Sequence, residues 1–337
     1  KVAEKYFSNL SFVKALEYYE DLAEGKNATK FQTQRTAECA LKVGDLNKAE
    51  YWYDKLYNTF PHDIDNMIQF AYVLKQNKKY GKANSIYKQI LKLEPGNKVA
   101  YDHLSNINYY QDLKDYKDRV NIRITNFNTS YDEFSPTYLD TTFKEIAFST
   151  NRKNDFLKNS KTAFDETYFL DIYKTTVDTA TKMNFQSKLS SKYHDGPVSF
   201  SNNGTVMYLT RNNYTDKNVG YSSKGNVNLK IYIAKKQGNV WGELQEFQYN
   251  SDQFSCGHAS VSEDGKTMYF TSDMPETKGE TDIFKTVLVE GKWTKPIPVP
   301  GINTEQKEMF PFITAEGVLF FSSYGRVGLG GLDIYRA

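Results

Sequence analysis

The chain has 337 residues, of which 39% are hydrophobic, 25% charged and 15% aromatic. Its 43 lysine and arginine residues nearly balance 41 aspartate and glutamate residues, so overall charge gives no reason to expect a nucleic acid partner. The two cysteines, Cys39 and Cys256, lie in different halves and predict two buried thiols rather than a disulfide framework.

The first third of the chain carries a 34-residue repeat with helical spacing. Three sets of positions keep this period, namely Ala15, Ala49 and Ala83; Tyr19, Tyr53 and Tyr87; and Leu22, Leu56 and Ile90. Pro61 and Pro95 follow the last turns of two units at the same spacing. A small residue where helices cross, with an aromatic residue one turn later, predicts stacked helix pairs over residues 1–127. We expect Asp112 to Ile124 to form a closing helix.

The first helices of such pairs line a concave surface that binds extended peptides or partner helices. Projecting the repeat places a set of candidate partner-binding residues on or near this surface. They are Gln34, Glu38, Lys42, Ile68, Tyr72, Lys75, Asp102, Asn106, Tyr109 and Tyr110. The alternative is that these side chains only solvate a short spacer, with Tyr109 and Tyr110 packed against the second domain.

Residues 128–337 contain a strand-rich unit that occurs four times. The buried anchors of the four units are Phe148, Leu209, Phe270 and Phe321. In the best copy, SEDGKTMYFTSD, Asp264-Gly265 predicts a tight two-residue hairpin turn. A third strand follows each anchor, as in DIY at Asp171 and DIF at Asp282, where the aspartate is expected to tie a turn through backbone hydrogen bonds. This repetition predicts propeller blades.

The predicted fold is therefore α + β, with an N-terminal helical solenoid and then a β-propeller that is incomplete in this chain. The fourth unit ends three strands in, at Ala337. Either the strand near residues 131–138 completes the last blade of an unusually small ring, or the chain is part of a longer protein with further blades. We expect the second.

The first two units have longer connections between anchor and third strand than the last two. Because insertions of this kind often carry binding function, their aromatic residues are further candidates for partner contact. They are Phe156, Phe164, Tyr168, Phe169, Tyr214 and Tyr221. The alternative is that these side chains fold back over a blade edge.

No pattern of catalysis or cofactor binding appears in the sequence. His62, His103, His194 and His258 lack metal-ligand spacing, and the glycine-rich segment 325–331 lies between two strands rather than between a strand and a helix. We therefore expect no catalytic residue, no metal and no cofactor.

The helical repeat resembles the tetratricopeptide repeat, and the blades resemble the TolB-like (PD40) propeller family. Their order, with phrases such as LKIYIAK, SDMPETKGETDIFK and GLGGLDIY, resembles the OmpA-family envelope proteins of Bacteroidota. These include the PorE-like peptidoglycan-associated component of the type IX secretion system. The resemblance implies further blades and an OmpA-like domain beyond Ala337, through which a longer parent would bind peptidoglycan.

The resemblance implies a non-catalytic scaffold in the periplasm, associated with the outer membrane. Its expected partners are proteins, such as an outer-membrane barrel of the PorP/SprF type or other secretion and gliding components. No apolar run is long enough for a membrane helix, so we expect that this segment does not span a bilayer. The start at Lys1 fits a trimmed terminus, with which a removed export signal would be consistent. Two alternatives remain, a TolB-like propeller module that binds peptides and a regulatory propeller of a hydrolase.

Overall fold

The computed structural model describes residues 1–108, 123–153, 160–176, 183–184, 189–215 and 218–337. The chain divides into two compact units. The first comprises residues 1–122, 161–167 and 327–331, and the second comprises 123–160, 168–326 and 332–337. The described residues thus form a helical unit and a β-rich unit.

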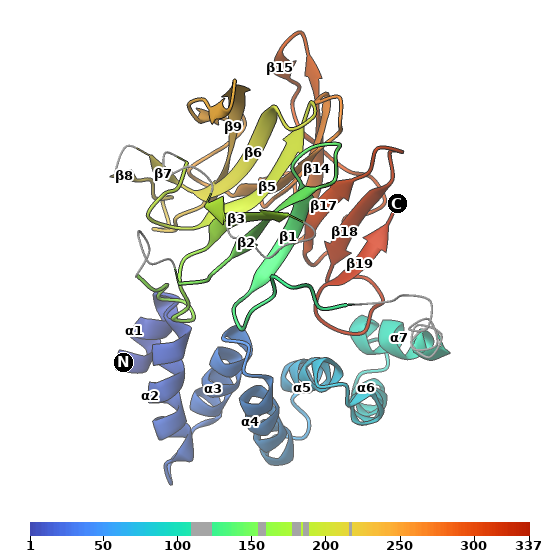
Figure 1. The fold of residues 1–337 in the computed structure, drawn as a ribbon. Coiled ribbons are helices and arrows are strands. Elements are labelled where there is room, and N and C mark those ends of the chain that lie inside the picture. Colours follow the sequence, from blue (N-terminus) through green and yellow to red (C-terminus); the bar gives the residue numbers. More distant parts are fainter. Residues whose placement is uncertain (109–122, 154–159, 177–182, 185–188, 216–217) are drawn as a thin grey trace. The chain divides into compact units, whose positions relative to one another are not determined.

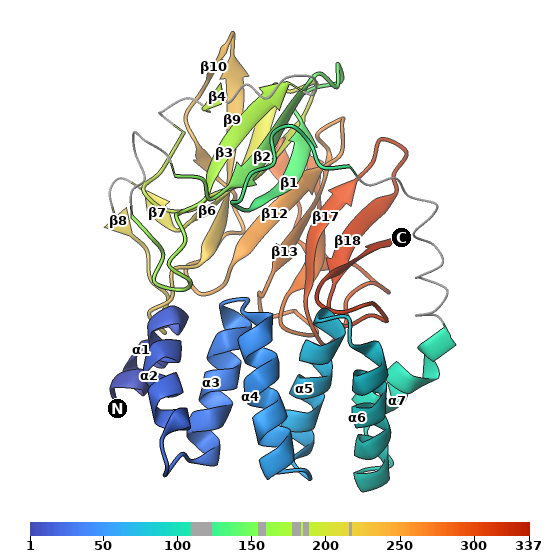
Figure 2. The same ribbon diagram turned by 60° about the horizontal axis from the view of Figure 1, so that its bottom comes forward.

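The helical unit contains seven helices within its described residues. They are α1 (Val2–Ser8), α2 (Phe12–Glu24), α3 (Lys30–Lys42), α4 (Leu46–Thr59), α5 (Ile64–Gln76), α6 (Tyr80–Leu93) and α7 (Lys98–Ser105). Each helix packs against the next one in the chain, and Figure 2 shows them following one another in sequence order. Most of the predicted closing helix, Asp112 to Ile124, lies outside the described residues.

The repeated small and aromatic positions form the core of this unit. Ala15, Ala49 and Ala83 are fully buried, and the aromatic set Tyr19, Tyr53 and Tyr87 is at most 4% exposed. A methyl group at each crossing lets adjacent helices approach closely, while the tyrosine ring fills the space one turn away. The third set departs from the prediction at Leu22, which is 43% exposed because Ala23 takes the buried position near the end of α2.

Short polar side chains start most of these helices. Asp45, Asp63 and Asn97 each accept a hydrogen bond from a backbone N–H in the first turn of α4, α5 and α7. Thr29 and Gln32 form a reciprocal capping box at the start of α3. These caps satisfy donors that have no partner within the helix and fix where each helix begins.

Removing the cap of α5 should measurably destabilise the helical unit. Asp63 accepts a bond from Asn66 N (3.1 Å) and also pairs with Lys30 Nζ. We expect Asp63→Ala to lower the free energy of unfolding by about 1–2 kcal/mol, measured by urea denaturation followed by helical circular dichroism. Asp65→Ala is the control, since Asp65 lies in the first turn of α5 and is exposed. Equal effects of the two changes would show that capping is not the cause.

The β-rich unit contains four larger antiparallel sheets and one two-stranded hairpin in its described residues. The first sheet is β1 (Glu133–Tyr138), β2 (Glu145–Thr150), β3 (Asp171–Thr176) and β4 (Met183–Asn184). The second is β5 (Asp195–Ser201), β6 (Val206–Asn212) and β9 (Leu229–Gln237), which pairs with both β10 (Val240–Trp241) and β11 (Gln245–Glu246). Between β6 and β9, a small hairpin is formed by β7 (Tyr214–Thr215) and β8 (Asn218–Val219).

The last two sheets repeat this order. The third is β12 (Cys256–Val261), β13 (Thr267–Ser272) and β14 (Asp282–Val289), which pairs with β15 (Lys292–Trp293) and β16 (Ile297–Pro298). The fourth is β17 (Glu308–Ile313), β18 (Leu319–Ser323) and β19 (Asp333–Arg336). The four sheets are arranged as a four-bladed propeller (Figure 1).

The predicted anchors sit at equivalent places in the four sheets. Each faces the aromatic residue of the third strand, in the pairs Phe148 with Tyr173, Leu209 with Tyr232, Phe270 with Phe284 and Phe321 with Tyr335. All four anchors are at most 2% exposed. This confirms the repeat read from the sequence.

The hairpin turn of the third blade is longer than predicted. Ser262 N donates to Thr267 O (2.8 Å), so four residues rather than two lie between the last hydrogen-bonded pair of this hairpin. The Asp264 carboxylate accepts from Ser262 Oγ and Lys266 N, and Gly265 supplies the positive φ of +69°. The turn is longer because the Asp264 side chain accepts hydrogen bonds from residues on both sides of it, and this local turn lies between Ser262 and Thr267.

The strand at residues 133–138 does not complete the last blade, contrary to one of the two alternatives. It is β1, the innermost strand of the first sheet, and it pairs with β2. The inner strands β1, β5, β12 and β17 contact one another in that order, and the Phe134 ring of β1 lies 6.3 Å from the Phe310 ring of β17. Figures 1 and 2 both show β1 beside β17. The expectation of further blades beyond Ala337 stays a prediction.

None of the helices in the described ranges combines the length and apolar character needed to cross a membrane.

Candidate binding surfaces

On the predicted helical face, α3 brings two candidates together. Gln34 Nε2 donates to Glu38 Oε1 (3.5 Å), and the guanidinium of Arg35 binds the other oxygen, Glu38 Oε2, at 2.6 Å. Lys42 at the end of α3 is exposed, with its ammonium 5.1 Å from the centre of the Phe12 ring. This part of the face is polar and carries both signs of charge.

The remaining described candidates on α5 and α7 differ in exposure. Ile68 and Tyr72 are half-buried and pack against the helical core, and Lys75 is also half-buried. Asp102 is exposed on α7, and Asn106 donates to its backbone oxygen at 2.7 Å. Tyr109 and Tyr110 lie outside the described residues. The face therefore has an apolar middle contributed by α5, between polar contributions from α3 and α7.

Arg35 is a member of this region that the sequence analysis missed. Its guanidinium lies over the rings of Phe7 (4.0 Å) and Phe31 (5.1 Å), and it is 3.8 Å from Glu4. An arginine three residues before a glutamate on one helix was the available signal. The aromatic partner from α1 could not be read from the sequence, because α1 lies outside the clear part of the repeat.

The two long connections of the propeller meet at one aromatic cluster. Phe169 packs edge-to-face against Tyr193 (5.3 Å between ring centres) and against His194 (4.8 Å). Tyr193 in turn packs against Tyr214 of the second connection (5.1 Å). Tyr214 and Phe169 both pack against the Tyr193 ring. Each is half-buried, so part of each side chain also faces solvent.

The other loop aromatics differ in exposure and in the unit to which they belong. Phe164 belongs to the helical unit, where its ring packs edge-to-face on Phe12 at 4.9 Å and remains 43% exposed. Tyr168 is half-buried, and Tyr221 is 60% exposed. Phe156 lies outside the described residues. Tyr221 is thus the most accessible of the predicted loop contacts that the structure describes.

The propeller contains a repeated buried ion pair that the sequence analysis also missed. In the first blade, Arg152 Nε donates to Glu133 Oε1 (2.9 Å), and in the second, Arg211 Nε donates to Asp195 Oδ1 (2.6 Å). Each arginine also donates to a backbone oxygen that precedes the inner strand, at Phe127 and Leu189. The pair ties the inner strand to the end of the second strand.

The last two blades change this pair in different ways. In the third blade Cys256 stands at the position of the acid and faces Ser272, as Asp195 faces Arg211 in the second, and both are buried. In the fourth, Arg326 still donates to the backbone oxygens of Gly301 and Ile302, but its Nε has no hydrogen-bond partner among the described residues. Glu308 instead accepts from Thr304 and Ser323. Aligning the four repeats brings the acids Glu133, Asp195 and Glu308 to one position, but it does not bring Arg152 and Arg211 to one position, because Glu133 faces Thr150 whereas Asp195 faces Arg211.

Each inner strand also carries a bulge, with a residue of positive φ next to it. These residues are Ser135, Gly196, His258 and Phe310. The His258 ring stacks on the Phe310 ring with 4.2 Å between centres. Its Nδ1 has no hydrogen-bond partner in the part of the chain that the structure describes, and burial lowers the pKa of the imidazole to about 4. The imidazole is therefore neutral at pH 7.

We expect the propeller to lose stability in acid through His258. Because its pKa is lower in the folded chain than its ordinary value of 6.5, the unfolded chain takes up the proton first. The stabilisation is fully present above pH 6.5 and is lost as the pH falls toward about 4. His258→Asn, which tolerates positive φ, should remove about 1–3 kcal/mol of this pH dependence in amide exchange of propeller peptides. His62→Asn in the helical unit is the control, and an unchanged acid response of the His258→Asn variant would contradict the assignment.

Both cysteines are buried and free, as predicted. Burial raises the pKa of each thiol to about 12, so neither is a reactive thiolate at neutral pH. Within the ranges that the structure describes, His, Cys, Asp and Glu side chains form no group of three that could hold a metal ion.

No protein-family model matches the chain, and no curated protein matches it. Among solved structures, it is similar to a puromycin-hydrolyzing peptidase of Mycobacterium tuberculosis, at 10% identity and a TM-score of 0.35, covering 59% of this chain and 29% of that one. An oligogalacturonate lyase in complex with manganese is 9% identical with a TM-score of 0.34, covering 57% and 47%. A prolyl endopeptidase is 14% identical with a TM-score of 0.30, covering 56% and 23%. The chain spans less than half the length of each, and likenesses this weak assign no function.

Proposed function

We propose that this chain is a non-catalytic scaffold, whose helical unit binds a segment of a partner protein on the face formed by α3, α5 and α7. The observation that carries the proposal is the exposure along this face. Half-buried Ile68 and Tyr72 lie on α5, while exposed charges lie on either side of them in the repeat, at Lys42 and Asp102. Apolar anchors with a polar rim are the usual composition of a protein-binding surface.

The resemblance of the sequence to OmpA-family envelope proteins supports a finer proposal. The partner would be an outer-membrane protein of the type IX secretion or gliding machinery, and the chain would lie in the periplasm. Peptidoglycan binding would belong to a domain beyond Ala337. In this role the helical unit contributes a rigid surface, since its core positions are packed and its helix starts are capped.

Cross-linking of detergent-solubilised cell envelopes, followed by mass spectrometry, tests this proposal. We expect an envelope protein cross-linked near α3 to α7. The double charge reversal Lys42→Glu with Asp102→Lys should reduce its recovery about tenfold, because both side chains are exposed and opposite charges at a rim mainly set binding rate and partner choice.

The matched control is Lys88→Glu, an exposed charge on α6. It should leave recovery unchanged. Recovery of the chain without an envelope partner, or an equal loss with Lys88→Glu, would contradict the proposed face.

A further inference from the structure

The turn between β1 and β2 holds a bulky residue in a backbone conformation that favours glycine. Phe143 has a φ of +55°, and its N–H donates to Asp140 O (3.4 Å) across the turn. In the third and fourth blades the residue that makes the equivalent bond is a glycine, at Gly265 and Gly317, with φ of +69° and +85°. Because a bulky side chain is strained in this conformation, the phenylalanine costs the turn stability that glycine would not.

The ring of Phe143 lies at the surface rather than in the core. It is 62% exposed, and it packs edge-to-face on Tyr138, which is itself 46% exposed, with 5.0 Å between ring centres. The two residues form an exposed aromatic pair at the end of the first hairpin. Burial therefore does not offset the strain, and a strained residue that stays exposed is a candidate for binding.

Hydrogen bonds within the turn and from the second blade fix this aromatic pair in place. Asp140 Oδ1 accepts from Thr142 N (2.9 Å) and from Thr142 Oγ1. Asn203, in the turn between β5 and β6, accepts through Oδ1 from Thr141 N (3.1 Å) and Thr141 Oγ1 (2.6 Å). Asn203 N in turn donates to Glu263 Oε1 in the third blade (3.0 Å). The pair is thus presented by a turn that needs little further ordering to bind a partner.

The unpaired charges beside the aromatic pair are positive. Lys144 belongs to the turn and Lys236 to β9, and both are exposed. Within the described ranges neither lysine forms an ion pair, whereas Glu145 is paired with Lys174 at 3.0 Å. Hydrogen bonds within the turn, and then the charges of both lysines, lower the pKa of Asp140, so both lysines lie near the turn. Two ammonium groups and one carboxylate leave this surface with a positive charge.

We propose that the aromatic pair, with Lys144 and Lys236, binds an acidic segment of a partner protein that carries an aromatic side chain. The partner's ring packs on Phe143, and carboxylates on either side of it pair with the two lysines. A membrane surface fits less well, because Glu263 and Asp264 of the adjoining turn are exposed and would be repelled by anionic lipids. This inference does not depend on the helical face.

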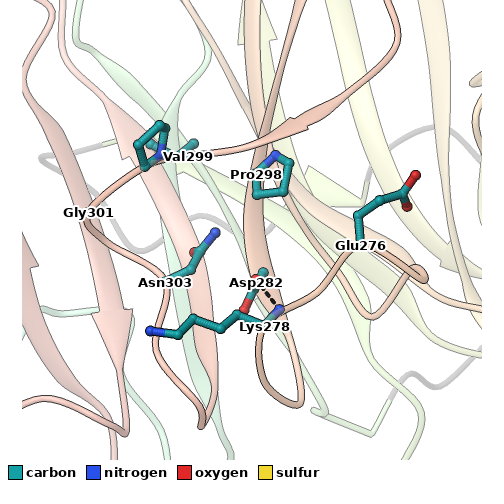
Figure 3. A pocket seen from close by; sticks show the side chains of 8 residues that line it. Glu276, Lys278, Asp282, Pro298, Val299, Gly301 and Asn303 are labelled. Atoms are coloured by element: carbon teal, nitrogen blue, oxygen red, sulfur yellow. Dashed lines mark hydrogen bonds between the residues drawn. The ribbon is translucent and has the colours of Figure 1, made fainter.

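The cavity of about 380 Å³ beside β14 is less suited to a partner (Figure 3). Asp282 in its wall is fully buried and accepts hydrogen bonds from the backbone N–H groups of Lys278 (2.7 Å) and Gly279, the first of which is drawn in Figure 3. Burial, and then the charge of Glu308, raise the pKa of Asp282. A ligand in the cavity could not reach this carboxylate. The exposed side chain of Lys278 at the rim provides a control lysine.

NMR of the intact chain with isotope-labelled phenylalanine tests the proposal, because the backbone N–H of Phe143 reports binding at the turn. The probe is the peptide acetyl-Asp-Asp-Phe-Asp-Asp-amide. Separate titrations use a peptide with Lys in place of each Asp, a peptide with Ala in place of Phe, and vesicles of phosphatidylcholine with phosphatidylserine. We expect saturable shifts with the acidic Phe peptide, none with the Lys peptide, and binding about tenfold weaker with the Ala peptide.

The anisotropy of a fluorescent copy of the acidic peptide measures the affinity of variants. Phe143→Gly should weaken binding about tenfold or more while leaving the thermal midpoint no lower, because glycine suits the left-handed backbone. Phe143→Tyr keeps the ring and should keep the affinity. Lys144→Gln combined with Lys236→Gln should weaken binding about tenfold. Lys278→Gln is the matched control and should leave it unchanged.

Several results would overturn the proposal. They are equal shifts with the Lys peptide, no saturable shift with the acidic peptide, and an affinity that Phe143→Gly leaves unchanged. A lower thermal midpoint of the Phe143→Gly chain would show that the ring serves stability instead, and would also overturn it. Vesicles that shift the Phe143 signal and displace the peptide would assign the surface to lipid, again against the proposal.

Discussion

Replacing Arg211 by methionine should destabilise the propeller by about 3–5 kcal/mol, because Asp195 would remain buried with its charge unpaired. Asp195 is 1% exposed and Arg211 is 7% exposed, so water cannot take over the lost bond of 2.6 Å. The change also removes the donor to the Leu189 backbone oxygen. Native-state amide exchange in peptides of the second sheet would report the loss without interference from the helical unit.

The third blade suggests a second substitution that should restore part of the lost stability. Asp195→Cys combined with Arg211→Ser reproduces the facing pair Cys256 and Ser272, which are both buried there without charge. We expect the double variant to recover at least half of the stability lost by Arg211→Met, since removing both charges leaves no buried ion. Arg336→Met, at an exposed arginine, is the control and should have little effect. A double variant less stable than Arg211→Met alone would show that the ion pair is not the cause.

The second large effect is expected at the anchor of the third blade. Phe270 is fully buried on β13, where its ring packs against Phe247 (5.5 Å) and Phe284 (5.9 Å). Phe270→Ala would leave a cavity between blades that surrounding strands cannot close, at a cost of about 3–5 kcal/mol. Amide exchange of peptides from β12 to β14 measures it.

The control for this substitution is Phe312→Ala on β17. Phe312 is 50% exposed, so its loss creates no internal cavity, and we expect a change of about 0.5 kcal/mol or less. If Phe312→Ala were as destabilising as Phe270→Ala, the anchors would not be the main source of propeller stability.

The sequence by itself determined the period of each unit and most of the buried positions. Ala49, Tyr53 and Leu56 are buried as their 34-residue spacing indicates, and the anchors pair with the aromatic residues of the third strands. Such patterns can be read from the sequence because every copy of the unit packs against its neighbours in the same way. The same residue types therefore recur at one period along the chain.

The sequence was least informative where residues from different repeats meet. It left open where the strand at residues 133–138 pairs, although β1 belongs to the first blade, and it predicted too short a turn at Asp264-Gly265. It brought Gln34 and Glu38 to one face through their helical spacing, but it could not show that Phe169 and Tyr214 meet through Tyr193. Contacts of the last kind depend on how two loops fold over separate sheets.

Local periodicity therefore fixed which side chains are buried, since burial within one helix or strand follows from its own spacing. The tertiary structure alone decided which buried charges are neutralised. Arg211 reaches Asp195 from the neighbouring strand, whereas Asp282 stands beside Glu308 with no paired cation among the described residues. The reason is that the energy of a buried charge depends on groups within a few ångströms in space, and strand pairing, rather than sequence distance, brings those groups together.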